Sequence, residues 1–482
     1  MLFRRQAEQV LEHNQQKKNQ KGKGMRWWDL SLIGTGAVIG AGFFLGTALS
    51  IHRAGPALLI NYLLGGLTAF LVFSALADMS VNDPQRGSFR VYARKAFGPS
   101  LGFMSGWMYW LAGVLIMSSE VAALSIFTRF WFPGVQVWVF AGIYAILGLG
   151  INLLGVKDFG RVESWFGLLK TSSLVIFILF GLLFISGLIA PALHAGHPAL
   201  GSAANPWLPG GLSGAWSAMI FVLFSYGGIE VMGILSCELK HPGEIRTSGR
   251  VMLASLTLIY TLALLFVFLM IPQQSVSLSE SPFVSALSIF GFGFIESLLN
   301  LLIISAAFST MVGALFAVTN VLVSLAEDGD APHGLEKRNS RGVPLSALSL
   351  TGIGLAVAVL VSFLLPNTVY EYLTTAAGVM LILNWLIILS SQIKNSLLYE
   401  RRPHPFGFRM PGYPYSSYAA MAVIILTIGG ALIAPGQRPG VLISLGLAAL
   451  IFITSQLHRQ GKLCWLGLSP QPARKPDSKD QS

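Results

Sequence analysis

The sequence is poor in charge. Asp, Glu, Lys and Arg make up 11% of its 482 residues, whereas hydrophobic residues make up 54%. Soluble globular chains carry about 25% charged residues, so a water-soluble fold of this composition would lack a polar surface. The long apolar runs also lack the alternation of apolar and polar residues that is typical of membrane barrel strands. The fold class that remains is a helical bundle embedded in a membrane.

Other absences narrow the function. The chain has only two cysteines, Cys237 and Cys464, too few for a disulfide framework or a cysteine metal site. The apolar runs contain no His, Asp and Glu spacing that suits a metal and no nucleophile paired with a base, so we expect no metal, no cofactor and no enzymatic activity. An ion channel would need repeated filter segments or rings of one charge, which are also absent. The first 24 residues contain no apolar core, so no signal peptide is expected.

Apolar runs of membrane-spanning length occur twelve times. The eighth is so long that we expect it to tilt or to protrude into water. The predicted spans are 30–52, 57–79, 100–128, 135–155, 163–190, 213–237, 248–272, 285–326, 344–365, 370–395, 416–434 and 439–457.

The distribution of Lys and Arg residues along the chain indicates the orientation of the protein in the membrane. The formal net charge is +11, which could suggest nucleic acid binding. If the N-terminus is cytoplasmic, however, nearly all Lys and Arg residues fall in cytoplasmic segments, as the positive-inside rule requires. The exceptions are Arg53, Arg129, Arg438 and Lys170. We therefore expect a multi-pass protein of the plasma membrane with both termini in the cytoplasm and no nucleic acid partner.

Two predicted spans are rich in glycine near their middle. The first contains Gly34, Gly36, Gly40, Gly42 and Gly46, and the sixth contains the run 224–230, Phe-Ser-Tyr-Gly-Gly-Ile-Glu. Such glycines allow close helix packing, which is one reading. The other reading is a pair of broken helices, five spans apart and opposite in direction, as in inverted-repeat transporters. Unpaired amides at such breaks can hold a carboxylate and unpaired carbonyls an ammonium, so the ligand would be a zwitterion.

Several motifs occur together in order. They are Gly-Thr-Gly-Ala-Val-Ile-Gly-Ala-Gly-Phe at 34–43, Gly-Ser-Phe at 87–89, the 224–230 run, Ala-Glu-Asp-Gly-Asp-Ala-Pro at 326–332 and Gly-Val-Pro at 342–344. With them the chain resembles amino acid permeases of the amino acid-polyamine-organocation superfamily over nearly its whole length. The resemblance implies an all-α membrane protein of 12 transmembrane helices, with a leucine-transporter-like 5+5 inverted repeat plus two extra helices. The implied divisions are a cytoplasmic tail (1–29), a first repeat (30–190), an external loop (191–212), a second repeat (213–395), two further helices (396–457) and a cytoplasmic tail (458–482).

The resemblance also implies a binding site for amino acids. The substrate carboxylate would lie against Ile39, Gly40, Ala41 and Gly42. The amino group would lie against Phe224, Ser225, Tyr226, Gly227 and Gly228. Phe224 is either an aromatic gate over the substrate or ordinary packing.

Three ionisable residues are expected at membrane depth. Lys170 lies seven residues past Glu163, about 10 Å deeper along a helix at 1.5 Å per residue. Charges at that depth are functional candidates, although a lysine can also extend its ammonium to the membrane surface. The resemblance places Lys170 where sodium-coupled relatives hold a cation, which implies proton coupling. Glu120 and Glu230 either brace helices or relay protons.

The expected function is therefore secondary active transport of amino acids, with proton-coupled uptake by alternating access. An amino acid exchanger and a transporter-like nutrient sensor remain alternatives. The absence of an acidic residue in the core of either glycine-rich segment favours a neutral substrate, whereas Glu120 and Glu230 leave a cationic one open. The expected partners are the amino acid, protons and the lipid bilayer, and the protein is expected to be a monomer.

Overall fold

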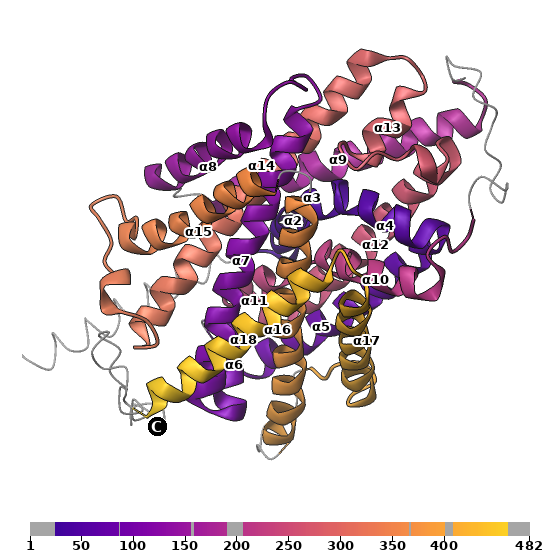
Figure 1. The fold of residues 1–482 in the computed structure, drawn as a ribbon. Coiled ribbons are helices and arrows are strands. Elements are labelled where there is room, and N and C mark those ends of the chain that lie inside the picture. The colour runs from indigo at the N-terminus through magenta and orange to yellow at the C-terminus, as the bar shows by residue number, and fades with distance from the viewer. Residues whose placement is uncertain are drawn as a thin grey trace, which may run out of the picture.

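The computed structural model describes residues 25–85, 87–155, 159–189, 206–365, 368–400 and 408–460. In these ranges the chain is helical, apart from one isolated bridge between Met25 and Leu239 (Figure 1). The N-terminal tail up to residue 24, most of the predicted external loop and the C-terminal tail from residue 461, with Cys464, lie outside the described residues. The predicted all-α class is confirmed for the described part.

The described part of the chain is built from α-helices, joined by turns and short 3-10 helices. In chain order they are α2 (Trp27–Val38), α3 (Ala41–Phe44), α4 (Gly46–Ala54), α5 (Leu58–Asn82), α6 (Ser88–Phe97), α7 (Pro99–Thr128), α8 (Val137–Leu154), α9 (Phe159–Ile185), α10 (Gly211–Phe224), α11 (Ile229–Leu235), α12 (Ile245–Met270), α13 (Pro282–Ser288), α14 (Gly293–Glu327), α15 (Leu345–Leu364), α16 (Val369–Tyr399), α17 (Tyr415–Ile433) and α18 (Arg438–Arg459).

Eleven stretches of the described chain are long and apolar enough to cross a membrane. The first, Ala41–Asn82, is divided at Gly55, whose φ of 56° ends α4 before α5 begins. When α2, α3 and α4 are taken as one segment and α10 and α11 as another, and the short helices α6 and α13 are set aside, the helices correspond to the twelve predicted spans. The described part therefore has the expected number of membrane segments.

The predicted eighth span, 285–326, is wrong at its start. The structure contains the short helix α13, then a turn, and then α14 from Gly293 onward. The turn occurs at Gly291, which has a φ of 70° and donates its amide to the carbonyl of Ser288 at 3.1 Å. Because the sequence around this glycine is apolar, a span predicted from hydropathy alone includes both helices, which the backbone separates. The remaining helix α14 still has 35 residues, so its length was anticipated.

Long helices surround the interrupted segments. In Figure 1, α7 crosses the middle of the bundle beside α14 and α16, and α2 and α3 lie close to this group. Helix α2 also packs against α9 and α12. Near the C-terminal end of α5, the buried carboxylate of Asp78 accepts hydrogen bonds from Gln392 Nε2 (2.8 Å) and the amide of Met410 (3.1 Å). These bonds connect α5 to α16 and to the segment before α17. The frame around the two interruptions is thus held by both apolar packing and buried polar contacts.

Candidate functional site

The first membrane segment is broken between α2 and α3. Ile39 (φ −75°, ψ 108°) and Gly40 (φ −147°, ψ −163°) are extended and separate the two helices. A Cβ on Gly40 would lie 2.5 Å from Glu120 Oε1, so a larger residue would collide with that carboxylate. The helix therefore opens at the glycine run that the sequence indicated.

Side chains from other helices pair the backbone groups that this break leaves free. The carboxylate of Glu120, on α7, accepts the amide of Ala41 at 3.0 and 3.1 Å from its two oxygens. Thr310 Oγ1, on α14, donates to the carbonyl of Ile39 at 2.9 Å. The hydroxyl of Tyr370, on α16, donates to the carbonyl of Ala41 at 2.8 Å. Buried backbone groups without partners would each cost about 1–3 kcal/mol, so these contacts stabilise the break.

Lys170 completes the pairing from α9. It is 1% exposed, and its Nζ donates to the carbonyl of Gly36 at 2.6 Å and to Thr310 Oγ1 at 2.7 Å. Its Nζ also lies 3.6 Å from Glu163 Oε1. The alternative that this lysine reaches the membrane surface is therefore wrong, because the ammonium points at the broken segment instead.

The sixth segment is broken between α10 and α11. Ser225, Tyr226, Gly227 and Gly228 form a turn, and Gly228 has a φ of 109°. A Cβ at Gly228 would lie 2.7 Å from the carbonyl oxygen of Ala37, on α2. The carboxylate of Glu230 accepts the amide of Gly228 at 3.0 Å and the indole Nε1 of Trp385. As at the first break, a buried glutamate caps a freed amide.

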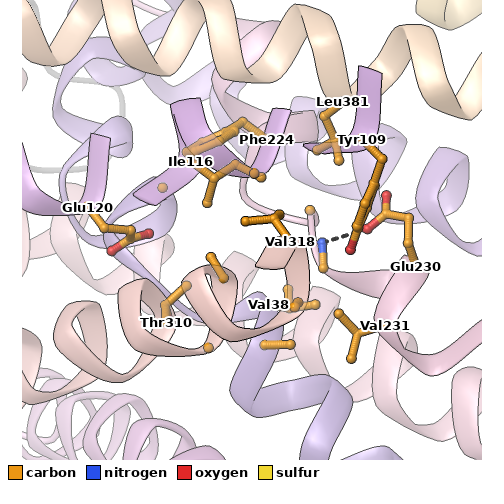
Figure 2. A pocket seen from close by; sticks show the side chains of 18 of the residues that line it. Val38, Tyr109, Ile116, Glu120, Phe224, Glu230, Val231, Thr310, Val318 and Leu381 are labelled. Carbon is orange, nitrogen blue, oxygen red and sulfur yellow. Dashed lines mark hydrogen bonds between the residues drawn. The ribbon is translucent and has the colours of Figure 1, made fainter. Parts of the chain in front are cut away.

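The two breaks face each other across a cavity of about 70 Å³. Figure 2 shows Glu120 and Glu230 at opposite ends of this cavity, with Phe224, Ile116 and Val318 between them. Of the predicted site residues, Gly42, Phe224, Gly227, Gly228, Glu120 and Glu230 line it. The ring of Phe224 lies over Gly42, where an added Cβ would be 2.8 Å from Cδ1.

The other predicted residues lie beside the cavity. Ile39, Gly40 and Ala41 are buried in the break itself, and Lys170 lies behind it. Ser225 and Tyr226 turn toward α5 and α12, where Tyr226 Oη donates to the carbonyl of Tyr62 at 3.0 Å. The structure thus brings both glycine-rich segments together and separates residues that line the cavity from residues that support it.

An aromatic cluster fills the space on the α3 and α4 side of the breaks. The ring of Phe43 stacks on Tyr260 with centroids 3.8 Å apart, and Tyr62 meets Phe43 edge-on at 5.6 Å. Phe283 completes the cluster at 5.1 Å from Phe43. Beyond it, Arg53 forms an ion pair with Glu371. All four rings of the cluster are buried, whereas the cavity is lined mainly by α7 and α14, with residues of α2, α11 and α16, Gly42 of α3 and Glu163 at the start of α9.

Several contributing residues were not predicted as site residues. Thr310, Tyr370 and Trp385 come from later helices, and no local motif marks them. Glu163 served only as a marker of depth, although it lies seven residues before Lys170 and therefore on the same helix face. Within the described residues, no group of three or more His, Cys, Asp or Glu side chains could hold a metal ion.

The chain is similar over nearly its whole length to known amino acid transporters. A family model for amino acid permeases matches residues 29–458. The transporter YcgH of Bacillus subtilis (strain 168) is 38% identical over 447 residues, which cover 93% of this chain and 97% of that protein. The amino acid permease YtnA of the same strain is 33% identical, covering 89% and 93%. The aromatic amino acid transport protein AroP of Escherichia coli (strain K12) is 31% identical, covering 91% and 97%.

The contact between the two breaks predicts the effect of a methyl group at Gly228. Because Gly228→Ala forces a left-handed backbone on alanine and pushes its Cβ against the carbonyl of Ala37, we expect a cost of about 1–3 kcal/mol. Thermal unfolding of the purified protein should show a midpoint several degrees below that of the unmodified chain. Gly46→Ala is the matched control, since its Cβ would make an ordinary contact at 3.5 Å with Tyr370 Oη. Equal midpoints for the two variants would contradict the geometry.

Proposed function

The chain belongs to the amino acid permease family, and on that premise we propose that it takes up amino acids across the plasma membrane together with protons. The observation that carries this proposal is the pair of broken segments that face each other across a buried cavity. Breaks of this kind supply backbone donors and acceptors at membrane depth, where a zwitterion has few other partners.

The amide of Gly42 supports a carboxylate site. Glu120 already occupies the amide of Ala41, whereas the amide of Gly42 has no protein acceptor in the described part and Gly42 lines the cavity. We assign the substrate carboxylate to this amide within the segment Ile39–Gly42. The amino group is assigned to the turn that runs from Phe224 to Gly228, because Phe224, Gly227 and Gly228 line the cavity. Phe224 then covers the substrate.

The cavity walls favour a neutral substrate with an apolar side chain. Ile116, Val231, Val318 and Leu381 form much of the wall. The carboxylates of Glu120 and Glu230 already accept backbone amides, so a cationic side chain would have to compete with these hydrogen bonds. The name of the relative AroP specifies aromatic amino acids, which fit walls of this kind. These observations weigh against the cationic alternative.

Proton coupling is assigned to Lys170. Its ammonium holds the carbonyl of Gly36 and the hydroxyl of Thr310, so gain or loss of a proton there changes how firmly α2 is held at its broken end. Glu120 and Glu230 brace the two breaks in this state, and a relay role for either remains part of the proposal. During alternating access, the first, second, sixth and seventh segments would rock against the rest, and the aromatic cluster around Phe43 would open.

The proposed orientation places both termini in the cytoplasm, because nearly all Lys and Arg residues then lie on that side. The lining residues on α2 and α11 then lie on the cytoplasmic side of the breaks. The proposed repeats are residues 30–190 and 213–395, with 396–457 as the two additional helices. An exchanger would share this geometry but would not respond to a pH gradient, and a sensor would bind without transport.

Reconstitution into proteoliposomes tests the coupling. We expect uptake of L-phenylalanine to rise with an inward proton gradient and to be indifferent to sodium. Lys170→Ala should abolish the response to the gradient, since no ammonium remains beside Gly36. Lys394→Ala, the same change at an exposed position, is the control and should retain the response. Strict dependence on sodium, or a gradient response that survives in Lys170→Ala, would contradict proton coupling through this residue.

A thermal-shift panel of the twenty amino acids tests the substrate class. A ligand that binds only the folded protein raises its apparent stability, by about 2.7 kcal/mol at a hundred times its Kd. We expect the largest shifts with Phe, Tyr, Trp and Leu and none with Asp, Glu, Lys or Arg. A largest shift with Lys or Arg would reject the neutral-substrate assignment and point to Glu120 or Glu230 as a partner for a cationic side chain.

A further inference from the structure

Glu163 is a buried carboxylate that neither the substrate site nor the pairing of the breaks uses. Its side chain is 4% exposed and it lines the central cavity. Its Oε1 lies 3.6 Å from Lys170 Nζ, yet it has no hydrogen-bond partner in the described part of the chain. Burying a carboxylate is costly unless its oxygens are well paired. A residue kept only to hold two helices together would be expected to make closer contacts.

The residue that follows Glu163 lines a second cavity. This cavity, of about 430 Å³, is lined by residues of α2 and α9, which include Asp29, Ile33, Ser164 and Trp165. Ile33 lines both cavities, so the two cavities approach each other beside α2. Ser164, which follows Glu163 directly, already belongs to the second cavity.

Helix α2 covers Glu163 through a contact between glycines. A Cβ on Gly36 would lie 2.8 Å from Glu163 Oε1, and a Cβ on Gly167 would lie 2.5 Å from the carbonyl oxygen of Leu32. The two helices therefore touch at backbone distance beside the carboxylate. Any tilt of α2 away from α9 would expose Glu163 to the second cavity while Lys170 remains deeper along the same helix.

Few other charges face this pair. Lys170 interacts electrostatically with Glu163 on its own helix and with Glu120 on α7. Helix α14 has no charged residue between Glu296 and Glu327 and contributes the hydroxyl of Thr310. On α12 the phenol of Tyr260 donates to the carbonyl of Ser225 at 3.4 Å, and α2 carries Asp29 near its start. Since Glu120 is engaged by the amide of Ala41, Glu163 is the carboxylate whose oxygen is available to accept a proton.

We propose that Glu163 is the residue through which Lys170 releases its proton toward the cytoplasm, an inference that rests on the proton coupling proposed above. In this step an N–H bond of the Lys170 ammonium breaks and an O–H bond forms on the Glu163 carboxylate, which leaves a neutral amine and a neutral carboxylic acid. Glu163 then loses the proton to water in the second cavity once α2 has moved. One proton passes from the site to the cytoplasmic side, and Glu163 returns to its ionised form.

The test compares two transport assays on the reconstituted full-length chain, with L-phenylalanine as the probe. Accumulation driven by an inward proton gradient requires proton release, whereas exchange of labelled for unlabelled L-phenylalanine at equal pH does not. For Glu163→Gln we expect the driven accumulation to fall on the order of a hundredfold, as for loss of a positioned proton acceptor, while exchange persists. Glu327→Gln, at an exposed helix end, is the matched control and should behave as the unmodified chain does.

Each outcome decides the matter. Normal driven accumulation in Glu163→Gln, or loss of exchange together with accumulation, would overturn the role of Glu163 while leaving proton coupling intact. Absence of driven accumulation in the unmodified chain would instead reject the coupling itself, and this inference with it.

A second variant provides the test if Glu163→Gln cannot be purified as a folded protein. Glu163→His keeps a side chain that can accept a proton. Retained coupling with a shifted pH profile of transport would then support the proposal, and an unchanged pH profile of transport would contradict it.

Discussion

The structure depends on how the backbone groups opened at the break between α2 and α3 are satisfied. In a membrane interior, an unpaired amide or carbonyl has no water with which to form a hydrogen bond. Here Glu120 accepts a hydrogen bond from the amide of Ala41. Thr310 donates to the carbonyl of Ile39, and Lys170 donates to the carbonyl of Gly36. These three side chains come from α7, α14 and α9, so the break exists only because the helices around it are in place. The glycines permit the break, and the buried polar side chains stabilise it.

The same contacts connect the proposed substrate site with the proposed proton site. Gly42, which lines the cavity, lies two residues beyond Gly40, and Thr310 bridges Lys170 to the carbonyl of Ile39. A change in the protonation of Lys170 alters its donors to both Gly36 and Thr310. In the proposed cycle, the proton and the amino acid therefore act on the same short stretch of backbone. Coupling between the two sites does not require a chain of contacts through distant residues. The second break has a parallel arrangement in which Glu230 caps Gly228 and is held by Trp385.

The sequence predicts the all-α class, the twelve spans and the locations of both breaks, because hydropathy and glycine are strong local signals. It fails at the start of the eighth span, where Gly291 interrupts an apolar run that hydropathy reads as continuous. The burial of Lys170 is also predictable, since its depth follows from its distance to Glu163. Thr310 and Tyr370 could not be found, because hydroxyls on apolar helices are common and a single sequence does not say which face meets the break. The helical spacing of Glu163 and Lys170 did carry the signal that the two side chains share a face.

An experimental structure with a bound amino acid would test the account most directly, at a resolution that places backbone carbonyls. We expect α2 and α3 to remain separated at Ile39 and Gly40, with Glu120 on the amide of Ala41 and the ligand carboxylate within hydrogen-bond distance of the amide of Gly42. A first segment that is continuously helical through these residues, or an amino acid bound away from both breaks, would contradict the account.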